Sequence, residues 1–263
     1  MISFFRRLFL LGASAALVAA VHAADPMARG EPPIIAKARA RLATDAVLDG
    51  VRSIHYVGTL ITTDANDPTK QVRASVKMIF QKPDRQCIIA TYDKNDQGVK
   101  PEEITALDAY EGWTRVQDLN DTKKWRLTLL DAEQVKLLRA NTWESLYYFR
   151  GIERIGGRVE DLGVATVDGT TCEKVAFAHD DKIKFYRYFD VATGRLVLTE
   201  TQSGATLREQ GELFAGGIRF PRTLITTTKV GDKTQTVTLN YDKITLNETF
   251  PASRFAVPSL AAK

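Results

Sequence analysis

The sequence predicts a mainly β protein, with one large, curved antiparallel sheet of about eleven strands and two helices on one face of that sheet. Three observations lead to this prediction. Apolar and polar residues alternate in many short segments, turn-rich links join these segments, and only two segments have helical periodicity. The chain of 263 residues is 44% hydrophobic and 26% charged, a composition that suits a single globular all-β domain.

The first 23 residues have the pattern of a secretory signal peptide. Arg6 and Arg7 precede the apolar run LFLLGASAALVAAV, and small residues then lead to a cleavage point before Ala24. An uncleaved membrane anchor is the alternative, but the run is short for the ~30 Å of hydrocarbon in a bilayer. We therefore expect one exported domain over residues 24–263, located in the periplasm.

The first helix is predicted over residues 34–48. Its basic residues, Lys37, Arg39 and Arg41, are expected on the solvent-facing side of the helix, opposite its apolar side. The whole chain has 36 basic and 32 acidic residues, and the signal accounts for two of the basic ones. So small an excess is not the electropositive footprint of a nucleic-acid-binding protein, and no nucleic-acid partner is predicted.

The sheet is expected to run from about residue 51 to residue 258. The segment QVRASVKMIF shows the pattern most clearly, because its apolar and polar residues alternate with a period of two. The apolar face of this segment carries Val72, Ala74, Val76, Met78 and Phe80. Similar runs separated by turns continue to the end of the chain, and strands in such an order form an antiparallel meander.

The second helix is predicted to interrupt the sheet at residues 131–149. Asp131 can cap its first free amides, and Gln134 can return a hydrogen bond to the cap residue. The aromatic end of the segment, with Trp143, suggests a lid over an apolar space, and Gly151, Gly156 and Gly157 follow as a hinge. A fixed helix that plugs the sheet is the alternative.

Two glycines and a proline shape the segment ELFAGGIRFPRTL. Gly216 and Gly217 permit the positive φ angles of a hairpin turn. Pro221 cannot donate a hydrogen bond, which predicts a bulge or an unpaired edge position there.

The two cysteines, Cys87 and Cys172, fall in separate predicted strands. A disulfide is possible in an oxidising compartment, but only a specific strand adjacency would bring the two Cα atoms within about 7 Å. Two separately buried thiols are the favoured interpretation.

The sequence favours a binding protein over an enzyme. It contains no nucleophile elbow, no zinc-protease motif and no phosphate-binding glycine loop. Only His55 and His179 remain after the signal is removed, too few for a histidine-based metal cluster or triad. The segment DKNDQG resembles the start of a calcium loop, but Ile104 stands where the bidentate glutamate is needed, so a polar hairpin tip is predicted. No cofactor and no metal are expected.

Five segments, in this order, resemble the LolA-like outer-membrane lipoprotein-sorting family of bacterial periplasmic proteins. They are ALDAYEGWTRVQD, VDGTTCEKVAF, YFDVATGRLVL, GELFAGGIRFPRTL and FPASRFAVP. The resemblance covers about residues 51–258 and is that of a divergent member. A position for the gating arginine of the well-studied carrier is not evident in this sequence.

This resemblance implies a half-open barrel with the helices on its concave side, enclosing an apolar cavity for the acyl chains of a lipoprotein or another lipid. It also implies a membrane transporter or acceptor as a further partner. The candidate lipid-binding residues on the apolar faces are Val76, Met78, Phe80, Trp113, Trp143, Phe185, Phe220 and Leu239. Ordinary core packing is the alternative for each of them. A second functional hypothesis is a periplasmic envelope-stress sensor that binds a membrane-anchored regulator.

Overall fold

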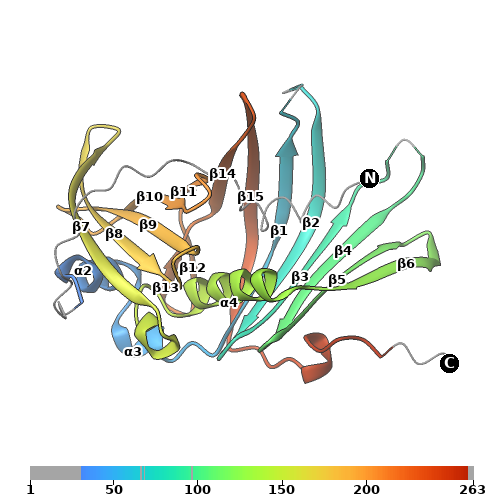
Figure 1. Cartoon of the computed structure of the whole chain (residues 1–263), viewed down its shortest axis with the longest axis horizontal. Helices are drawn as coiled ribbons and strands as arrows, with labels where there is room; N and C mark the ends of the chain where they lie inside the picture. Colours follow the sequence, from blue (N-terminus) through green and yellow to red (C-terminus); the bar gives the residue numbers. More distant parts are fainter. Residues whose placement is uncertain (1–30, 66, 68, 96, 260–263) are drawn as a thin grey trace.

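The computed structural model describes residues 31–259 except 66, 68 and 96, so the predicted signal lies outside the described residues. Its main feature is a sheet of 13 antiparallel strands, with helix α4 (Ala132–Leu146) lying across the concave side (Figure 1). The two edge strands of this sheet, β6 (Asp121–Leu129) and β7 (Arg158–Val167), do not pair with each other, so the described sheet is open. The predicted fold class is confirmed.

The described residues form fifteen strands, more than the eleven predicted, and two of these make a separate hairpin. The remaining bounds are β1 (Ser53–Thr63), β2 (Gln71–Gln81), β3 (Arg85–Tyr92), β4 (Pro101–Asp108), β5 (Glu111–Asp118), β8 (Thr170–Ala178), β9 (Lys184–Asp190), β10 (Leu196–Thr201), β11 (Thr206–Gln210), β12 (Leu213–Ala215), β13 (Ile218–Phe220), β14 (Thr223–Val230) and β15 (Lys233–Leu246).

Most strands pair with their neighbours in the chain. The order is β6-β5-β4-β3-β2-β1-β15-β14-β11-β10-β9-β8-β7. One meander runs from β1 to β6 and another from β7 to β11, and the last two long strands join them, because β15 pairs with β1 and β14 pairs with β11. Short connections explain this arrangement, since strands joined by hairpins pair with each other.

A β-bulge helps to bend the sheet at the join between the meanders. The register of β1 against β15 shifts between Val57 and Gly58. A Cβ atom on Gly58 would lie 2.0 Å from the carbonyl oxygen of Asn240, so only glycine fits this close approach. Bulges of this kind bend a strand and increase its twist.

The alternation predicted for residues 72–80 is present in β2 from Ala74 onward, whereas Val72, near the start of the strand, is exposed. Ala74, Val76, Met78 and Phe80 are buried, and the polar residues between them are exposed. The buried face belongs to the largest core cluster, on the concave side of the sheet.

The predicted helix 34–48 is two helices, α2 (Pro33–Leu42) and α3 (Asp45–Asp49). The break lies at Ala43, whose backbone is extended, and at Thr44, which takes the N-cap position of α3. Threonine is favoured at an N-cap and an acidic residue is favoured in the first helical turn, so a new helix begins here. The solvent-facing assignment of Arg39 is wrong, since its side chain is 1% exposed.

Helix α4 has the predicted capping box. Asp131 Oδ1 accepts a hydrogen bond from Gln134 N at 2.9 Å, and Gln134 Oε1 accepts one from Asp131 N at 3.0 Å. After the helix, Gly151 and Gly156 have φ angles of 80° and 84° and flank a short 3-10 helix, Ile152–Ile155. Among the residues that the structure describes, no helix combines the length and hydropathy needed to cross a membrane.

The GG segment forms the predicted hairpin turn. Gly216 and Gly217 have φ angles of 54° and 78°, and they connect β12 to β13. Pro221 lies between β13 and β14, at the point where the chain leaves the two-stranded hairpin and enters the main sheet. A residue without an N–H donor suits this point, because no ladder partner is needed between the two strands.

Both cysteines are free and buried, as favoured from the sequence. Cys87 lies on β3 and Cys172 on β8, and these two strands are not neighbours in the sheet. Burial raises the pKa of Cys87 to about 11, which suppresses the reactive thiolate in the folded protein.

We therefore expect unreduced protein to take up two equivalents of a thiol reagent after denaturation and to react slowly while folded. The measurement is a colorimetric thiol titration with and without denaturant. Reduced and unreduced samples should match in the denatured state, whereas an unreduced sample with no titratable thiol would show a disulfide and contradict the strand order.

Candidate functional site

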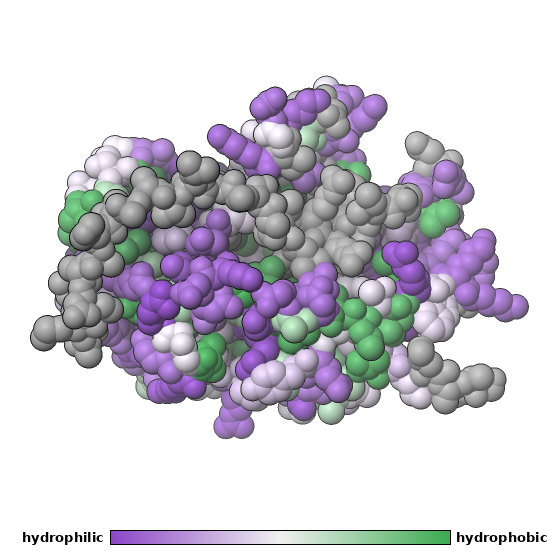
Figure 2. All heavy atoms as spheres, viewed as in Figure 1, coloured by the Kyte–Doolittle hydropathy of each residue, from purple (hydrophilic) through white to green (hydrophobic). Residues whose placement is uncertain are grey.

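A cavity of ≈ 1510 Å³ lies between the concave side of the sheet and helices α2 and α4. Strands from both meanders contribute to its walls, so only the complete sheet encloses it. The apolar side chains on its walls include Leu60, Met78, Phe80, Phe149, Phe185, Leu207, Phe220, Leu224, Val237 and Leu239. Most of the described surface in Figure 2 is hydrophilic, with smaller hydrophobic areas between.

The strand wall of the cavity is apolar because of the strand register. Leu224 on β14 lies opposite Leu239 on β15, and Leu239 lies opposite Leu60 on β1. Residues directly opposite each other on antiparallel strands project from the same face, so these three leucines form a continuous row. Beside this row, the ring of Tyr56 lies edge-on to that of Phe220, with centroids 6.0 Å apart.

The helix wall of the cavity is more polar. The residues of α4 that line the cavity are Glu133, Gln134, Leu137, Asn141, Glu144 and Ser145, while Val135, Leu138, Thr142 and Leu146 are buried. The hydroxyl of Thr142 lies 2.9 Å from Gln86 Oε1 on β3, which fixes the buried face of the helix to the sheet. The cavity thus has a row of leucines on its strand wall and a more polar helix wall, and the strands add further polar side chains, among them Arg187, Thr199 and Glu209.

Five of the eight candidate residues line this cavity: Met78, Phe80, Phe185, Phe220 and Leu239. Val76 belongs to the same core cluster as Met78 and Phe80 but does not line the cavity. Trp143 lies in a second core cluster and stacks on Tyr147, with ring centroids 3.6 Å apart. This packing suits a fixed helix at the aromatic end of α4, and the lid stays a prediction.

Trp113 lies on the opposite face of the sheet. It pairs with Ala106, and Ala106 pairs with Cys87, so the three share one face. Cys87 in turn lies opposite Ile79, so Ile79 is also on this face. Side chains alternate along a strand, so its neighbours Met78 and Phe80 point to the cavity side. The indole Nε1 of Trp113 donates a hydrogen bond of 2.8 Å to the carbonyl oxygen of Phe255, in the C-terminal segment that covers this face.

A buried charge cluster joins α4 to the second meander. Glu144 Oε2 accepts a hydrogen bond from Nη1 of Arg187 on β9, and Glu144 Oε1 lies 2.6 Å from Nε2 of His179. All three side chains are 7–8% exposed. The guanidinium of Arg187 also lies 4.8 Å from the ring centroids of Phe149 and Phe177. Burial would raise the pKa of Glu144, but Arg187 and His179 outweigh it and hold this pKa below its usual value.

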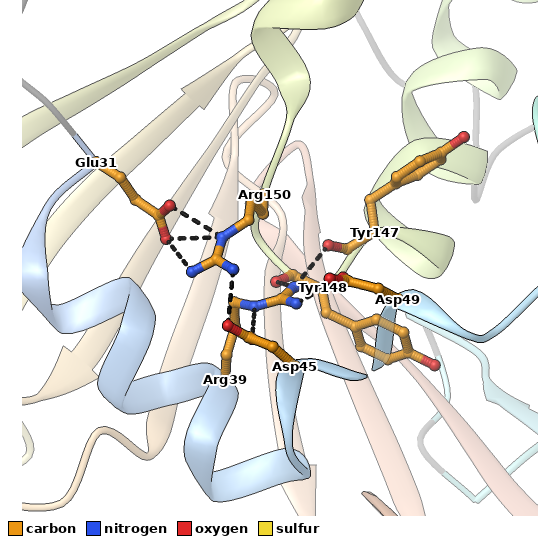
Figure 3. A network of polar contacts seen from close by, with 7 residues as sticks. All are labelled: Glu31, Arg39, Asp45, Asp49, Tyr147, Tyr148 and Arg150. Atoms are coloured by element: carbon orange, nitrogen blue, oxygen red, sulfur yellow. Dashed lines mark hydrogen bonds and ion pairs between the residues drawn. The ribbon is translucent and has the colours of Figure 1, made fainter. Parts of the chain in front are cut away.

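A second network ties α2 and α3 to the end of α4 (Figure 3). Arg39 donates to Asp45 at 2.7 Å and to Asp49 at 2.8 Å. Its Nη1 donates to the carbonyl oxygens of Tyr148 and Tyr147, at 2.9 and 3.2 Å. This side chain therefore satisfies the buried carbonyl oxygen of Tyr148 just after α4 and adds a second donor to that of Tyr147, which also accepts from Arg150 N.

Sequence reasoning did not identify Glu144, Arg187 or Glu209 as cavity residues. The alternation in TLREQ, residues 206–210, could have placed Glu209 on the same face as the apolar Leu207. The approach of Glu144 to Arg187 had no local signal, since these residues are 43 positions apart.

Comparisons with known proteins agree with the fold. No protein-family model matches this chain, and no curated protein matches it in sequence. Among solved structures, a LolA superfamily protein from Nitrosomonas europaea has a TM-score of 0.55 at 11% identity, covering 81% of this chain and 96% of that one. An outer membrane lipoprotein-sorting protein domain from Vibrio parahaemolyticus has a TM-score of 0.51 at 11% identity, covering 84% and 95%.

A DUF1329 family protein from Desulfovibrio piger is also similar, with a TM-score of 0.54 at 8% identity, covering 85% of this chain and 95% of that chain. These alignments span nearly the whole of each solved chain, and their identities are low enough that they bear on the fold alone. With its open antiparallel sheet, concave-side helices and central cavity, this chain has the fold of the LolA-like lipoprotein-sorting proteins.

Proposed function

We propose that this protein is a periplasmic carrier that shields the acyl chains of a lipoprotein or another lipid during transfer toward the outer membrane. A membrane transporter that delivers the lipid, or an acceptor that receives it, is the partner such a role requires. The role needs apolar area and no reactive group, so the protein is proposed to be a binding protein without cofactor or metal and not an enzyme.

The cavity is the observation that carries this proposal. Its volume of ≈ 1510 Å³ exceeds the roughly 300–1,000 Å³ of ordinary small-molecule sites, and its strand wall carries the row of Leu224, Leu239 and Leu60. Each buried methylene contributes about 0.8 kcal/mol, so one ~16-carbon chain would contribute on the order of 12 kcal/mol before ordering costs. Such a ligand should remain bound through gentle purification.

The direct test is organic extraction and mass spectrometry of protein purified from a lipid-containing host. We expect acyl chains in a near-stoichiometric amount. Protein that contains no lipid and takes up no fluorescent fatty acid would contradict the carrier. Copurification of a membrane-anchored regulator in place of lipid would favour the sensor instead.

Leu224→Asp is expected to lower fatty-acid binding at least tenfold, because it places a carboxylate in the apolar row of the cavity wall. Leu224 is half-buried, so the variant should still fold. Binding is measured by titration with a fluorescent fatty acid, and folding by circular dichroism.

The matched control is Ile225→Asp. Ile225 is also half-buried on β14, but it points to the other face of the sheet, since adjacent residues of a strand alternate. The Ile225→Asp variant should bind the fatty acid with the same affinity as the wild type. Equal binding losses in the two variants would show that the cavity is not the binding site.

A further inference from the structure

One carboxylate stands in the apolar wall of the cavity. Glu209 on β11 lies opposite Leu224 on β14, which begins the row that continues through Leu239 to Leu60. All four side chains line the cavity. Glu209 is therefore the β11 member of a cross-strand row whose members on β14, β15 and β1 are all leucines.

Glu209 has no ion pair among the residues that the structure describes. The cations that act on it are Arg187 and Arg219, and each is already paired with another carboxylate, that of Glu144 and that of Glu212 respectively. The side chain of Glu209 is exposed to the space of the cavity, but the protein atoms packed around that space raise its pKa in spite of these two arginines. Once a hydrocarbon chain fills the cavity and displaces its water, this carboxylate is costly unless a hydrogen-bond donor of the ligand meets it.

Tyrosine hydroxyls also line the cavity. Tyr148 is 8% exposed, and its buried hydroxyl has no hydrogen-bond partner among the described residues. Burial, Tyr148 and Glu209 all raise the pKa of Tyr56, so Tyr56 interacts with both of these residues. Burial and the Glu209 carboxylate both raise the pKa of Tyr241, another lining residue, so these two groups interact. Polar atoms buried without partners in a cavity are what a ligand's polar group would satisfy.

We propose that Glu209 binds the ammonium group of an amphiphilic ligand whose hydrocarbon chain lies along the leucine row. This inference rests on the proposed lipid-binding function and names the ligand class. An ammonium has three donors, so it can satisfy the carboxylate and also donate to a tyrosine hydroxyl. An anionic head group would instead meet an unpaired carboxylate, while both arginines near it are already neutralised.

The test uses three ligands with the same hydrocarbon chain: hexadecylamine, hexadecanol and hexadecanoic acid. Their affinities are measured near neutral pH by displacement of the neutral fluorophore N-phenylnaphthylamine, below the concentrations at which the ligands form micelles. We expect the amine to bind about tenfold or more tightly than the alcohol, as for one charged hydrogen bond, and the acid to bind no better than the alcohol. The net charge of the chain is positive, +4 in full and +2 without the two arginines of the predicted signal, so non-specific electrostatic attraction would oppose this preference and cannot produce it.

Glu209→Gln should remove the preference for the amine and leave the affinity for hexadecanol within about twofold, because the amide keeps the shape without the charge. The matched control is Glu111→Gln, the same change at an exposed position of the β4–β5 turn, which should keep the preference. If Glu209→Gln fails to fold, the order of the affinities of the wild-type protein for the three ligands still tests the proposal.

The outcomes separate the two proposals. Binding of all three ligands without preference, or a preference for the acid, would overturn the role of Glu209 and leave the lipid carrier standing. Loss of the amine preference in both glutamine variants would also overturn it, because the charge effect would not be local. Failure of all three ligands to displace the fluorophore would overturn the carrier and, with it, the assignment of its head group.

Discussion

Glu144→Ala is expected to lower the free energy of unfolding by about 3–5 kcal/mol, because it leaves the buried guanidinium of Arg187 without a counter-charge. The same change removes the 2.6 Å contact with His179 and so disconnects α4 from β9 and the segment before it. Urea unfolding followed by circular dichroism measures the loss. A change below about 1 kcal/mol would mean that water reaches this pair in the folded protein.

A double-mutant cycle separates the ion pair from packing. Glu144→Gln and Arg187→Gln should each destabilise, whereas the double variant should recover part of the loss, since no charge is then left buried. The surface control is Glu133→Gln on the same helix. Its partner Lys136 and Glu133 itself are both more than half exposed, so the cost should stay below about 1 kcal/mol.

The same carboxylate gives a pH dependence with a defined sign. The pKa of Glu144 in the folded protein lies below its ordinary value of 4.5, because Arg187 and His179 outweigh the effect of burial. Its contribution to stability is therefore complete above about pH 4.5 and is lost as the pH falls through the folded-state pKa. The wild type should lose more stability than Glu144→Gln over this acid range.

Arg39→Ala is the second large change, with an expected loss of about 2–4 kcal/mol. The side chain is 1% exposed, and its removal leaves the carbonyl oxygen of Tyr148 without its donor, whereas that of Tyr147 keeps the backbone N–H of Arg150 at 3.3 Å. Asp45 and Asp49 are more than half exposed, so water can solvate them and they add little to the cost. The free energy of unfolding again provides the measurement.

Two further variants, Arg150→Ala and Arg39→Lys, are the controls for Arg39→Ala. Arg150→Ala removes the other arginine of the network in Figure 3, but this side chain is 33% exposed and pairs with partly exposed carboxylates, so it should cost under about 1 kcal/mol. Arg39→Lys should fall between the wild type and Arg39→Ala, because lysine keeps the charge but lacks the planar fork of donors. Equal effects of Arg39→Ala and Arg150→Ala would contradict the burial that we assign to Arg39.

Local patterns in the sequence predicted the fold class well. Alternation with a period of two depends only on which face of a strand is buried, and β2 shows it as expected. The capping box at Asp131 and Gln134 involves residues three positions apart, so it too was visible locally. The break between α2 and α3 was missed because helical periodicity continues across it.

The candidate cavity residues were only partly predictable. Alternation divides a strand into two faces but does not say which face lies on the concave side, so Trp113 was assigned to the same face as Met78. Helical periodicity placed Arg39 with the exposed Lys37, although the fold buries it under the end of α4. Both errors concern the direction in which a correctly predicted element is packed.

The sequence by itself determined the antiparallel sheet, the hairpin at Gly216 and Gly217, and the start of α4, because neighbouring residues decide backbone preferences and the period of burial. Only the tertiary structure decided which apolar face encloses the cavity, and that Glu209 shares a wall with Leu224, Leu239 and Leu60. Pairing of β15 with β1 and of β14 with β11 brings together two meanders that are distant in the chain. The resulting registers depend on contacts across the whole sheet, and these have no signal in a short window of sequence.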